Sequence, residues 1–104
     1  MKNAEIVILP AQAGTKLLKV VLKGDLTIKN SSEIREQILG NIKDINTLEI
    51  QTEEVTSIDL AFYQLLISFK KLFNQSEKNI IISLIIPEEL EDLLKNGGLD
   101  INLN

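Results

Sequence analysis

The chain has 104 residues, of which 44% are hydrophobic and 25% are charged, and its formal net charge is −4 at pH 7. This composition is typical of one globular domain and excludes a largely disordered chain, and the negative charge gives nucleic acid no general attraction. The sequence lacks cysteine and histidine, which excludes disulfides, thiolate chemistry and the commonest metal ligand. We therefore expect residues 1–104 to form a single domain that binds no nucleic acid, metal or cofactor.

The N-terminus shows no secretory signal, because the apolar run Ile6–Leu9 is short and Pro10 ends it. Apolar runs elsewhere are far shorter than the roughly 18 residues that a membrane-spanning helix requires. We expect a soluble, cytoplasmic protein that does not insert directly into a membrane.

Two short runs rich in Ile, Leu and Val predict the first strands. They are Ala4–Leu9 and Leu17–Lys23, and Pro and Gly in Pro10–Gly14 predict the turn between them. A connection this short favours antiparallel pairing. The strand then breaks, and Gly24–Asn30 is predicted to be a loop.

The first helix is predicted to begin at about Asn30, where Asn30 or one of the two serines that follow it can act as the cap. Isoleucines at helical spacing form its core stripe: Ile34, Ile38, Ile42 and Ile45. Thr47–Gln51 alternates apolar and polar residues and predicts the third strand. A strand, a helix and another strand predict a parallel pair with a right-handed crossover.

The most apolar helical pattern follows, in a helix predicted at about Asp59–Asn74. One face of this helix is core, but Leu60, Tyr63 and Ile67 fall together on the opposite face, where a surface helix usually carries polar groups. We call these three residues the apolar stripe. They are either buried beneath another segment of the chain or exposed as a protein-binding surface, and we favour the second interpretation.

The remaining residues predict a strand at Ile80–Ile86, buried on both faces, and a helix that begins at Pro87 and ends at Asn96–Gly98. Leu99–Leu103 can add a short edge strand. The order along the chain is ββαβαβα, which predicts an α/β fold with helices packed on a mixed sheet.

This topology predicts where functional residues converge. Parallel strands point their carboxyl ends to one edge of a sheet, and α/β proteins tend to bind their partners there. That edge includes the predicted loops Gly24–Asn30 and Thr52–Ile58 and the start of the central helix. We call it the binding edge, and five of its residues are expected to be neighbours: Asp25, Thr27, Ser57, Asp59 and Leu60.

Asp25 and Asp59 are the only carboxylates that the topology plausibly brings together. Two such acids can do general acid–base work. The commoner roles are a helix cap for Asp59 and a turn for Asp25, and no glycine-rich nucleotide-binding motif occurs in the sequence. We predict that the protein is not an enzyme.

Gly24-Asp25-Leu26 after a strand, and Val55-Thr-Ser-Ile-Asp59 before an apolar helix, resemble the STAS domains, the anti-sigma factor antagonist family. The resemblance covers nearly the whole chain, up to Leu93-Leu94-Lys95-Asn96-Gly97-Gly98-Leu99. It implies a STAS-like fold and a non-catalytic module that binds proteins. In that family a Ser or Thr just after the Asp accepts a phosphate, and here Leu60 occupies this position.

The resemblance implies a role in bacterial signal transduction or transcription regulation, with a GHKL-type anti-sigma factor kinase, a phosphatase, a chemosensory protein or a transporter ATPase as partner. Because Leu60 has no hydroxyl, we expect a constitutive or partner-regulated binder, with the binding edge and the apolar stripe as its contact surface. Three alternatives remain open: a STAS-type subunit of a lipid-transport ATPase complex, a phosphorylation switch displaced to Ser57 or Thr56, and a homodimer formed through the apolar stripe.

Overall fold

A computed structural model of the chain describes residues 4–9 and 16–104. The predicted order ββαβαβα is confirmed, with elements β1 (Ala4–Leu9), β2 (Leu17–Leu26), α1 (Ile28–Leu39), β3 (Thr47–Ile58), α2 (Leu60–Gln75), β4 (Asn79–Ser83) and α3 (Glu88–Asn96). The turn predicted at Pro10–Gly14 lies outside the described residues. Across the described part of the chain, no helix combines the length and the apolar character that a membrane span requires.

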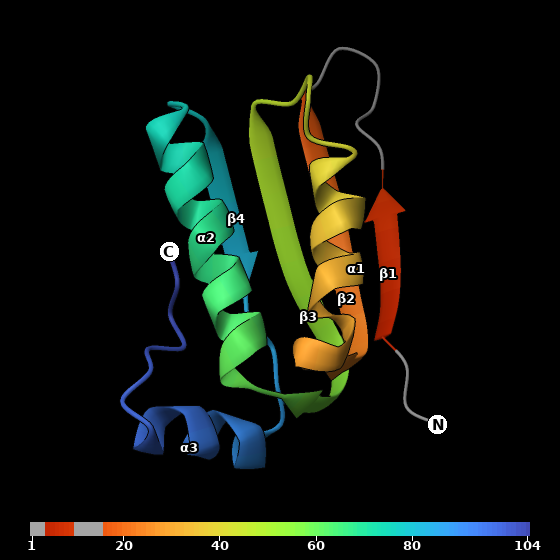
Figure 1. The fold of residues 1–104 in the computed structure, drawn as a ribbon. Helices are drawn as coiled ribbons and strands as arrows, with labels where there is room; N and C mark the ends of the chain where they lie inside the picture. The colour runs from red at the N-terminus through yellow and green to blue at the C-terminus, as the bar shows by residue number, and fades with distance from the viewer. Residues whose placement is uncertain (1–3, 10–15) are drawn as a thin grey trace.

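The strands form a four-stranded mixed sheet in the order β1-β2-β3-β4. β1 is antiparallel to β2, whereas β2, β3 and β4 are parallel to one another. Figure 1 shows α1 and α2 running in the same direction over one face of the sheet, with α3 at the end where β2 and β3 finish. The core lies between that face and the two helices, and this is the α/β arrangement that the sequence predicted.

The opposite face of the sheet is open and carries ion pairs. Residues of β2 alternate between the two faces, so that Leu18, Val20 and Leu22 are buried while Lys19 and Lys23 are partly exposed. Lys19 Nζ lies 3.3 Å from a carboxylate oxygen of Glu49, and Lys23 Nζ lies 3.8 Å from Glu5 and 3.7 Å from Glu53. Both lysines of the open face therefore have acidic partners on neighbouring strands.

β2 and β3 are longer than predicted, and the loops expected at Gly24–Asn30 and Thr52–Ile58 are wrong. Gly24–Leu26 continue β2, α1 begins at Ile28, and Thr52–Ile58 continue β3. The register between β2 and β3 shifts by one residue at two points: Gly24 aligns with Val55, and Asp25 aligns with Ser57. Gly24 and Glu54 have φ angles of 88° and 48°, typical of bulges that insert extra residues into a strand. Glycine and acidic residues are rare in strands, so their presence suggested a loop instead.

β4 is shorter than the predicted strand Ile80–Ile86, and the prediction that both its faces are buried is wrong. Ile81 is 43% exposed, because β4 is at the edge of the sheet and the helices cover only one face. Beyond Ser83 the pairing with β3 is replaced by one side chain. The hydroxyl of Thr52 donates to the carbonyl of Ile85 at 2.8 Å and accepts from the Ile85 N–H at 2.7 Å.

The edge strand predicted at Leu99–Leu103 does not form, and a side chain covers the edge of β4 instead. Asn104 Oδ1 accepts from the N–H of Ile82 at 2.9 Å, and Asn104 Nδ2 donates to the carbonyl of Ile82 at 2.9 Å. Leu103 is buried in the core. We call Leu99–Asn104 the C-terminal segment; it is anchored by side chains and not by strand pairing.

Candidate partner-binding site

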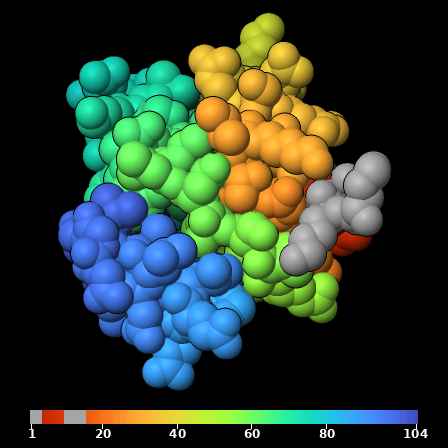
Figure 2. Space-filling view, turned by 60° about the horizontal axis from the view of Figure 1, so that its bottom comes forward, coloured from red at the N-terminus to blue at the C-terminus, as the bar shows by residue number. Residues whose placement is uncertain are grey.

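The binding edge forms where the sheet and the two helices meet. The carboxyl ends of β2 and β3 lie beside the first turns of α1 and α2 (Figure 1), and Figure 2 views this end, with α1 in orange and the start of α2 in green. Asp25 aligns with Ser57 and Leu26 with Ile58 in the parallel register. The structure thus brings the predicted edge residues together on adjacent backbone segments.

Asp59 holds the N-termini of both helices. Its Oδ1 accepts from the N–H of Phe62 at 3.0 Å and caps α2, while its Oδ2 accepts from the N–H of Ile28, the first residue of α1, at 2.8 Å. Thr27, at the N-cap of α1, makes no side-chain capping bond. One carboxylate therefore serves the positive ends of two helix dipoles and ties the helices together at the binding edge.

The cap predicted for α1 at Asn30 or the serines is wrong, because the helix begins earlier, at Ile28. Asn30 Nδ2 donates to the carbonyl of Asp25 at 2.8 Å, and the Ser31 hydroxyl donates to the carbonyl of Thr27 at 2.9 Å. These bonds hold the chain between β2 and α1 in a tight connection. The sequence indicated that Asn30 and the serines make local hydrogen bonds, but it did not show that the acceptors are backbone carbonyls before the helix.

Asp25 is a strand residue and is only 8% exposed. Its Oδ1 is buried and has no hydrogen-bond partner within the described ranges. No hydrogen bond joins Asp25 to Asp59 there either, since both oxygens of Asp59 contact backbone N–H groups. The two acids are close in the fold but each has its own surroundings.

The hydroxyls of the binding edge differ in exposure. Thr56 is exposed and lies at an irregularity of β3, while Ser57 and Thr27 are partly buried. Leu60, directly after the Asp59 cap, is the first residue of α2 and is 52% exposed. A large apolar side chain thus faces solvent at the start of the helix.

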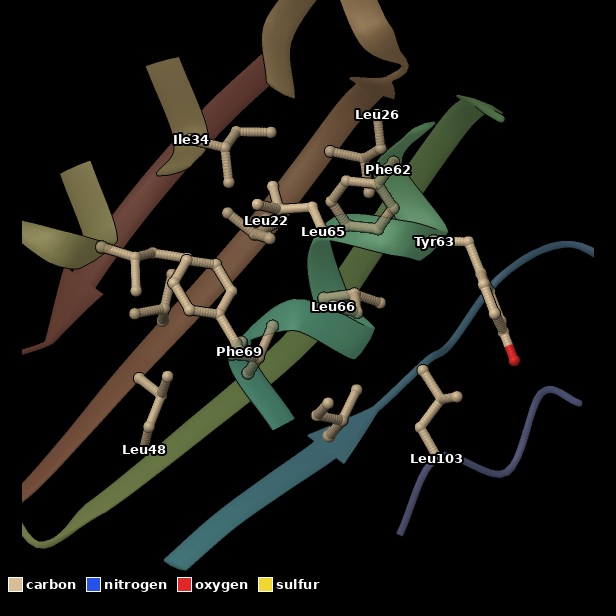
Figure 3. Close-up of a cluster of buried hydrophobic side chains, with 14 of the residues drawn as sticks. Leu22, Leu26, Ile34, Leu48, Phe62, Tyr63, Leu65, Leu66, Phe69 and Leu103 are labelled. Atoms are coloured by element: carbon tan, nitrogen blue, oxygen red, sulfur yellow. The ribbon is translucent and has the colours of Figure 1, made fainter. Parts of the chain in front are cut away.

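The C-terminal segment covers part of the apolar stripe, so the expectation that the whole stripe is exposed is wrong for Tyr63. Tyr63 is only 8% exposed, and its hydroxyl donates to the carbonyl of Asp100 at 2.8 Å. Figure 3 shows its ring directed toward Leu103 and the C-terminal segment. The burial interpretation holds for Tyr63, while Ile67 is partly buried and Leu60 stays exposed.

A groove of about 420 Å³ runs along α2 beside Leu60, and we call it the Leu60 groove. Its lining consists of Leu60, Tyr63, Gln64, Ile67, Ser68, Lys71 and Leu99. All three stripe residues therefore contribute to one surface, with Tyr63 exposing only a small part of its ring. The contribution of Leu99 was not predicted, because the alternation of apolar and polar residues over Leu99–Leu103 indicated an edge strand and not a wall of this groove.

The fold and the site define a small α/β module whose exposed features are a polar edge and an apolar groove. The STAS domain family model matches residues 8–103, so the chain belongs to the STAS domain family, and the resemblance is confirmed. No curated protein sequence matches the chain significantly.

Two solved structures share the fold. The phosphorylated form of SpoIIAA, a Bacillus cell fate determinant, has a TM-score of 0.65 and 15% identity, over 91% of this chain and 85% of that chain. The anti-sigma factor antagonist SpoIIAA in its unphosphorylated form has a TM-score of 0.61 and 13% identity, over 91% of this chain and 100% of that chain. At these identities the similarity establishes the fold.

Proposed function

We propose that this protein is a non-catalytic module of bacterial signalling or transcription regulation that binds a protein partner through the Leu60 groove and the binding edge. The exposure of Leu60 carries the proposal. Its side chain is 52% exposed at the rim of an apolar groove, and Asp59 fixes the turn from which it projects. Because only about half of this side chain is exposed, covering it in a complex contributes roughly half of the 1.5–3 kcal/mol expected for burying a fully exposed leucine, about 1 kcal/mol.

The roles of the two aspartates favour binding over catalysis. Asp59 is occupied by backbone N–H groups of Phe62 and Ile28, and it shapes the surface from which Leu60 projects. Asp25 lies within β2 and is only 8% exposed, with its Oδ1 buried. A general acid or base needs access to a substrate proton, and neither carboxylate offers it in this arrangement.

The partner classes follow from the family. SpoIIAA, which shares the fold, is an anti-sigma factor antagonist and exists in a phosphorylated form. By analogy the partner is a GHKL-type anti-sigma factor kinase, a phosphatase, a chemosensory protein or a lipid-transport ATPase. Since Leu60 has no hydroxyl, binding at this residue is constitutive or is regulated by the partner.

Replacing Leu60 by Glu tests this function. We expect Leu60→Glu to weaken binding of the native partner at least about tenfold, because it puts a charge where apolar surface is to be buried. Ile81→Glu is the matched control, since Ile81 has similar exposure on the opposite side of the sheet. The partner is identified by co-purification from the native cells with the wild-type protein, and its affinity for each purified variant is then measured. Equal affinity for the wild type and a folded Leu60→Glu protein would refute the proposal.

A phosphorylation switch at Thr56 is the second candidate, with Ser57 as its alternative position. The exposed hydroxyl of Thr56, close to the Asp59 cap, favours it. Mass spectrometry of the protein from its own cells, under several growth conditions, tests this switch. Phosphate on Thr56 or Ser57 would support it, and unmodified peptides under every condition would leave the fixed binder.

Self-association through the apolar stripe gives a different prediction for the isolated protein. With Tyr63 covered by the C-terminal segment, the apolar stripe exposes less area for a flat dimer contact than the sequence predicted. We expect a monomer in sedimentation at micromolar concentration. A dimer that Leu60→Glu dissociates would favour the homodimer instead.

A further inference from the structure

A second groove lies on the outer side of the two helices, away from Leu60. It has a volume of about 410 Å³ and is formed by Arg35 and Leu39 of α1 together with Phe69, Lys71 and Leu72 of α2. We call it the α1–α2 groove. Phe69 is buried at its base, whereas Leu72 is 40% exposed. The groove therefore combines an apolar surface with a cation from each helix.

The cations of this groove have no acidic partners among residues 4–9 and 16–104. Neither Arg35 nor Lys71 takes part in an ion pair there, and no acidic side chain lines the groove. Glu33 and Glu36 of α1 are exposed but are not part of the lining. The lysines of the open sheet face, by contrast, are paired with glutamates.

The combination of apolar surface and cationic side chains continues toward the end of α2. A smaller hollow of about 200 Å³ begins on the other side of Leu72, and Lys43 and Lys78 are part of its lining. No acidic residue of the described ranges lines this hollow, and α2 itself contains none over Leu60–Gln75. In a chain with a net charge of −4, an apolar surface flanked by cations that form no ion pair within the described ranges is a local reversal of charge.

We propose that the α1–α2 groove docks an acidic amphipathic helix of a protein partner. A third helix packs naturally into the groove between two helices, with apolar residues spaced three or four apart along the contact. Those residues would cover Leu39 and Leu72, and carboxylates on the flanks of the helix would pair with Arg35 and Lys71. Arginine favours this pairing because its guanidinium binds a carboxylate through two hydrogen bonds.

The shape of the surface favours a helix over a lipid bilayer. Peripheral membrane helices insert protruding apolar side chains into the interface, whereas here the apolar side chains line a concave groove. The proposal does not depend on the partner of the Leu60 groove. The two grooves share only Ser68 and Lys71, and Arg35 belongs to the α1–α2 groove alone.

The probe is a fluorescent helical peptide of about 18 residues, long enough for five turns, with leucines on one face and glutamates on both flanks. A second peptide carries glutamine in place of every glutamate. By fluorescence anisotropy at low salt we expect the glutamate peptide to bind the full chain at least about tenfold more tightly. NMR shift changes are expected at Leu39, Phe69 and Leu72, which line the α1–α2 groove and not the Leu60 groove.

Two matched double variants test the cations. Arg35→Glu with Lys71→Glu should weaken binding of the glutamate peptide at least about tenfold. Lys16→Glu with Lys29→Glu makes the same charge change at exposed sites outside the groove and should weaken binding less than about threefold. If the first double variant does not fold, Arg35→Gln with Lys71→Gln replaces it, because it removes the charges without reversing them.

Several results would overturn the proposal. Equal affinity for the two peptides, or no affinity for either, would exclude recognition of acidic groups. Equal losses of affinity in both double variants would show that peptide binding depends only on net charge. NMR shift changes confined to the Leu60 groove would show that the peptide binds there instead. Binding to phosphatidylglycerol vesicles that the Arg35 and Lys71 variant abolishes, without peptide binding, would assign the surface to a membrane.

Discussion

Asp59 determines much of the geometry at the binding edge, because each of its carboxylate oxygens accepts a hydrogen bond from a different helix. The bond to Phe62 is an N-cap within its own helix, but the bond to Ile28 spans 31 residues of sequence. The position of α1 relative to α2 therefore depends on one side chain at this end. A residue that a sequence marks as a helix cap can thus have a second, tertiary role.

Replacing Asp59 by Ala should lower the free energy of unfolding by about 1–2 kcal/mol, through the loss of the cap and of the hydrogen bond from the exposed N–H of Ile28. Urea denaturation followed by circular dichroism measures this change. Asp44→Ala is the control, because Asp44 is exposed and makes no side-chain bond within the described residues. Equal stabilities of the two variants would show that Asp59 does not link the helices.

A cap of this kind was predictable from the sequence, and its second bond was not. Asp before an apolar helical pattern is a common N-cap signal, so the bond to Phe62 followed from local rules. Ile28 lies in a segment that looked like a loop before Asn30, and only the assembled sheet brings its N–H to Asp59. The burial of Tyr63 could not be predicted from local rules either, because the segment that covers it, including the Asp100 carbonyl that accepts its hydrogen bond, is 37 residues away in sequence.

At the scale of elements, the β2–β3 pair shows how bulges extend a strand beyond its sequence pattern. Gly24 adopts a left-handed φ of 88° where the register with β3 shifts. Helical periodicity and strand alternation predicted most element types correctly, because a buried face repeats at a fixed spacing. The ends of β2 and β3 could not be predicted in this way, because a bulge depends on the partner strand.

Gly24→Ala should destabilise the fold by about 1–2 kcal/mol, since an L-residue at this φ places its Cβ against the backbone. Gly97→Ala is the control: Gly97 has a φ of −82°, and a Cβ there would meet nothing closer than 3.4 Å. The control should be neutral or stabilise the protein slightly, because alanine restricts the unfolded chain. Thermal and urea unfolding provide both values, and equal losses in the two variants would contradict the role of φ.

The C-terminal segment replaces the missing edge strand with one side-chain amide. Asn104→Ala should speed hydrogen exchange at the Ile82 amide about fivefold, as expected for the loss of one hydrogen bond of about 1 kcal/mol. The amide of Ile50, in the middle of the sheet, should be unaffected, and Asn74→Ala on α2 is the matched control variant. Unchanged exchange at Ile82 would mean that another group protects the β4 edge.

For the whole molecule, the radius of gyration of 13.4 Å is close to the roughly 13 Å expected of one domain of this size. The single domain stays a prediction until its cooperativity is measured. Tyr63 is the only tyrosine, and the chain has no tryptophan, so its fluorescence reports directly on the docking of the C-terminal segment. Circular dichroism reports on α1 and α2.

We expect the two signals to change together, with one midpoint in urea, because Tyr63 and Leu103 belong to the same core as the helices. Leu103→Ala should lower that midpoint for both signals by a similar amount. A tyrosine transition at clearly lower urea would instead show that the C-terminal segment unfolds separately. In that case the Leu60 groove would lose Leu99 while the rest of the fold persisted.

The bonds between Asn104 and Ile82 also bear on how copies of the chain behave in a crowded solution. An uncovered edge strand with an apolar sequence, such as the Ile-Ile-Ile of β4, is a template for pairing with another chain and for aggregation. By occupying both backbone groups of Ile82, the last of the three isoleucines, one asparagine blocks part of that template. Asn104 is thus expected to limit aggregation through the edge of β4, and replacing it should increase aggregation more at high protein concentration than in a dilute sample.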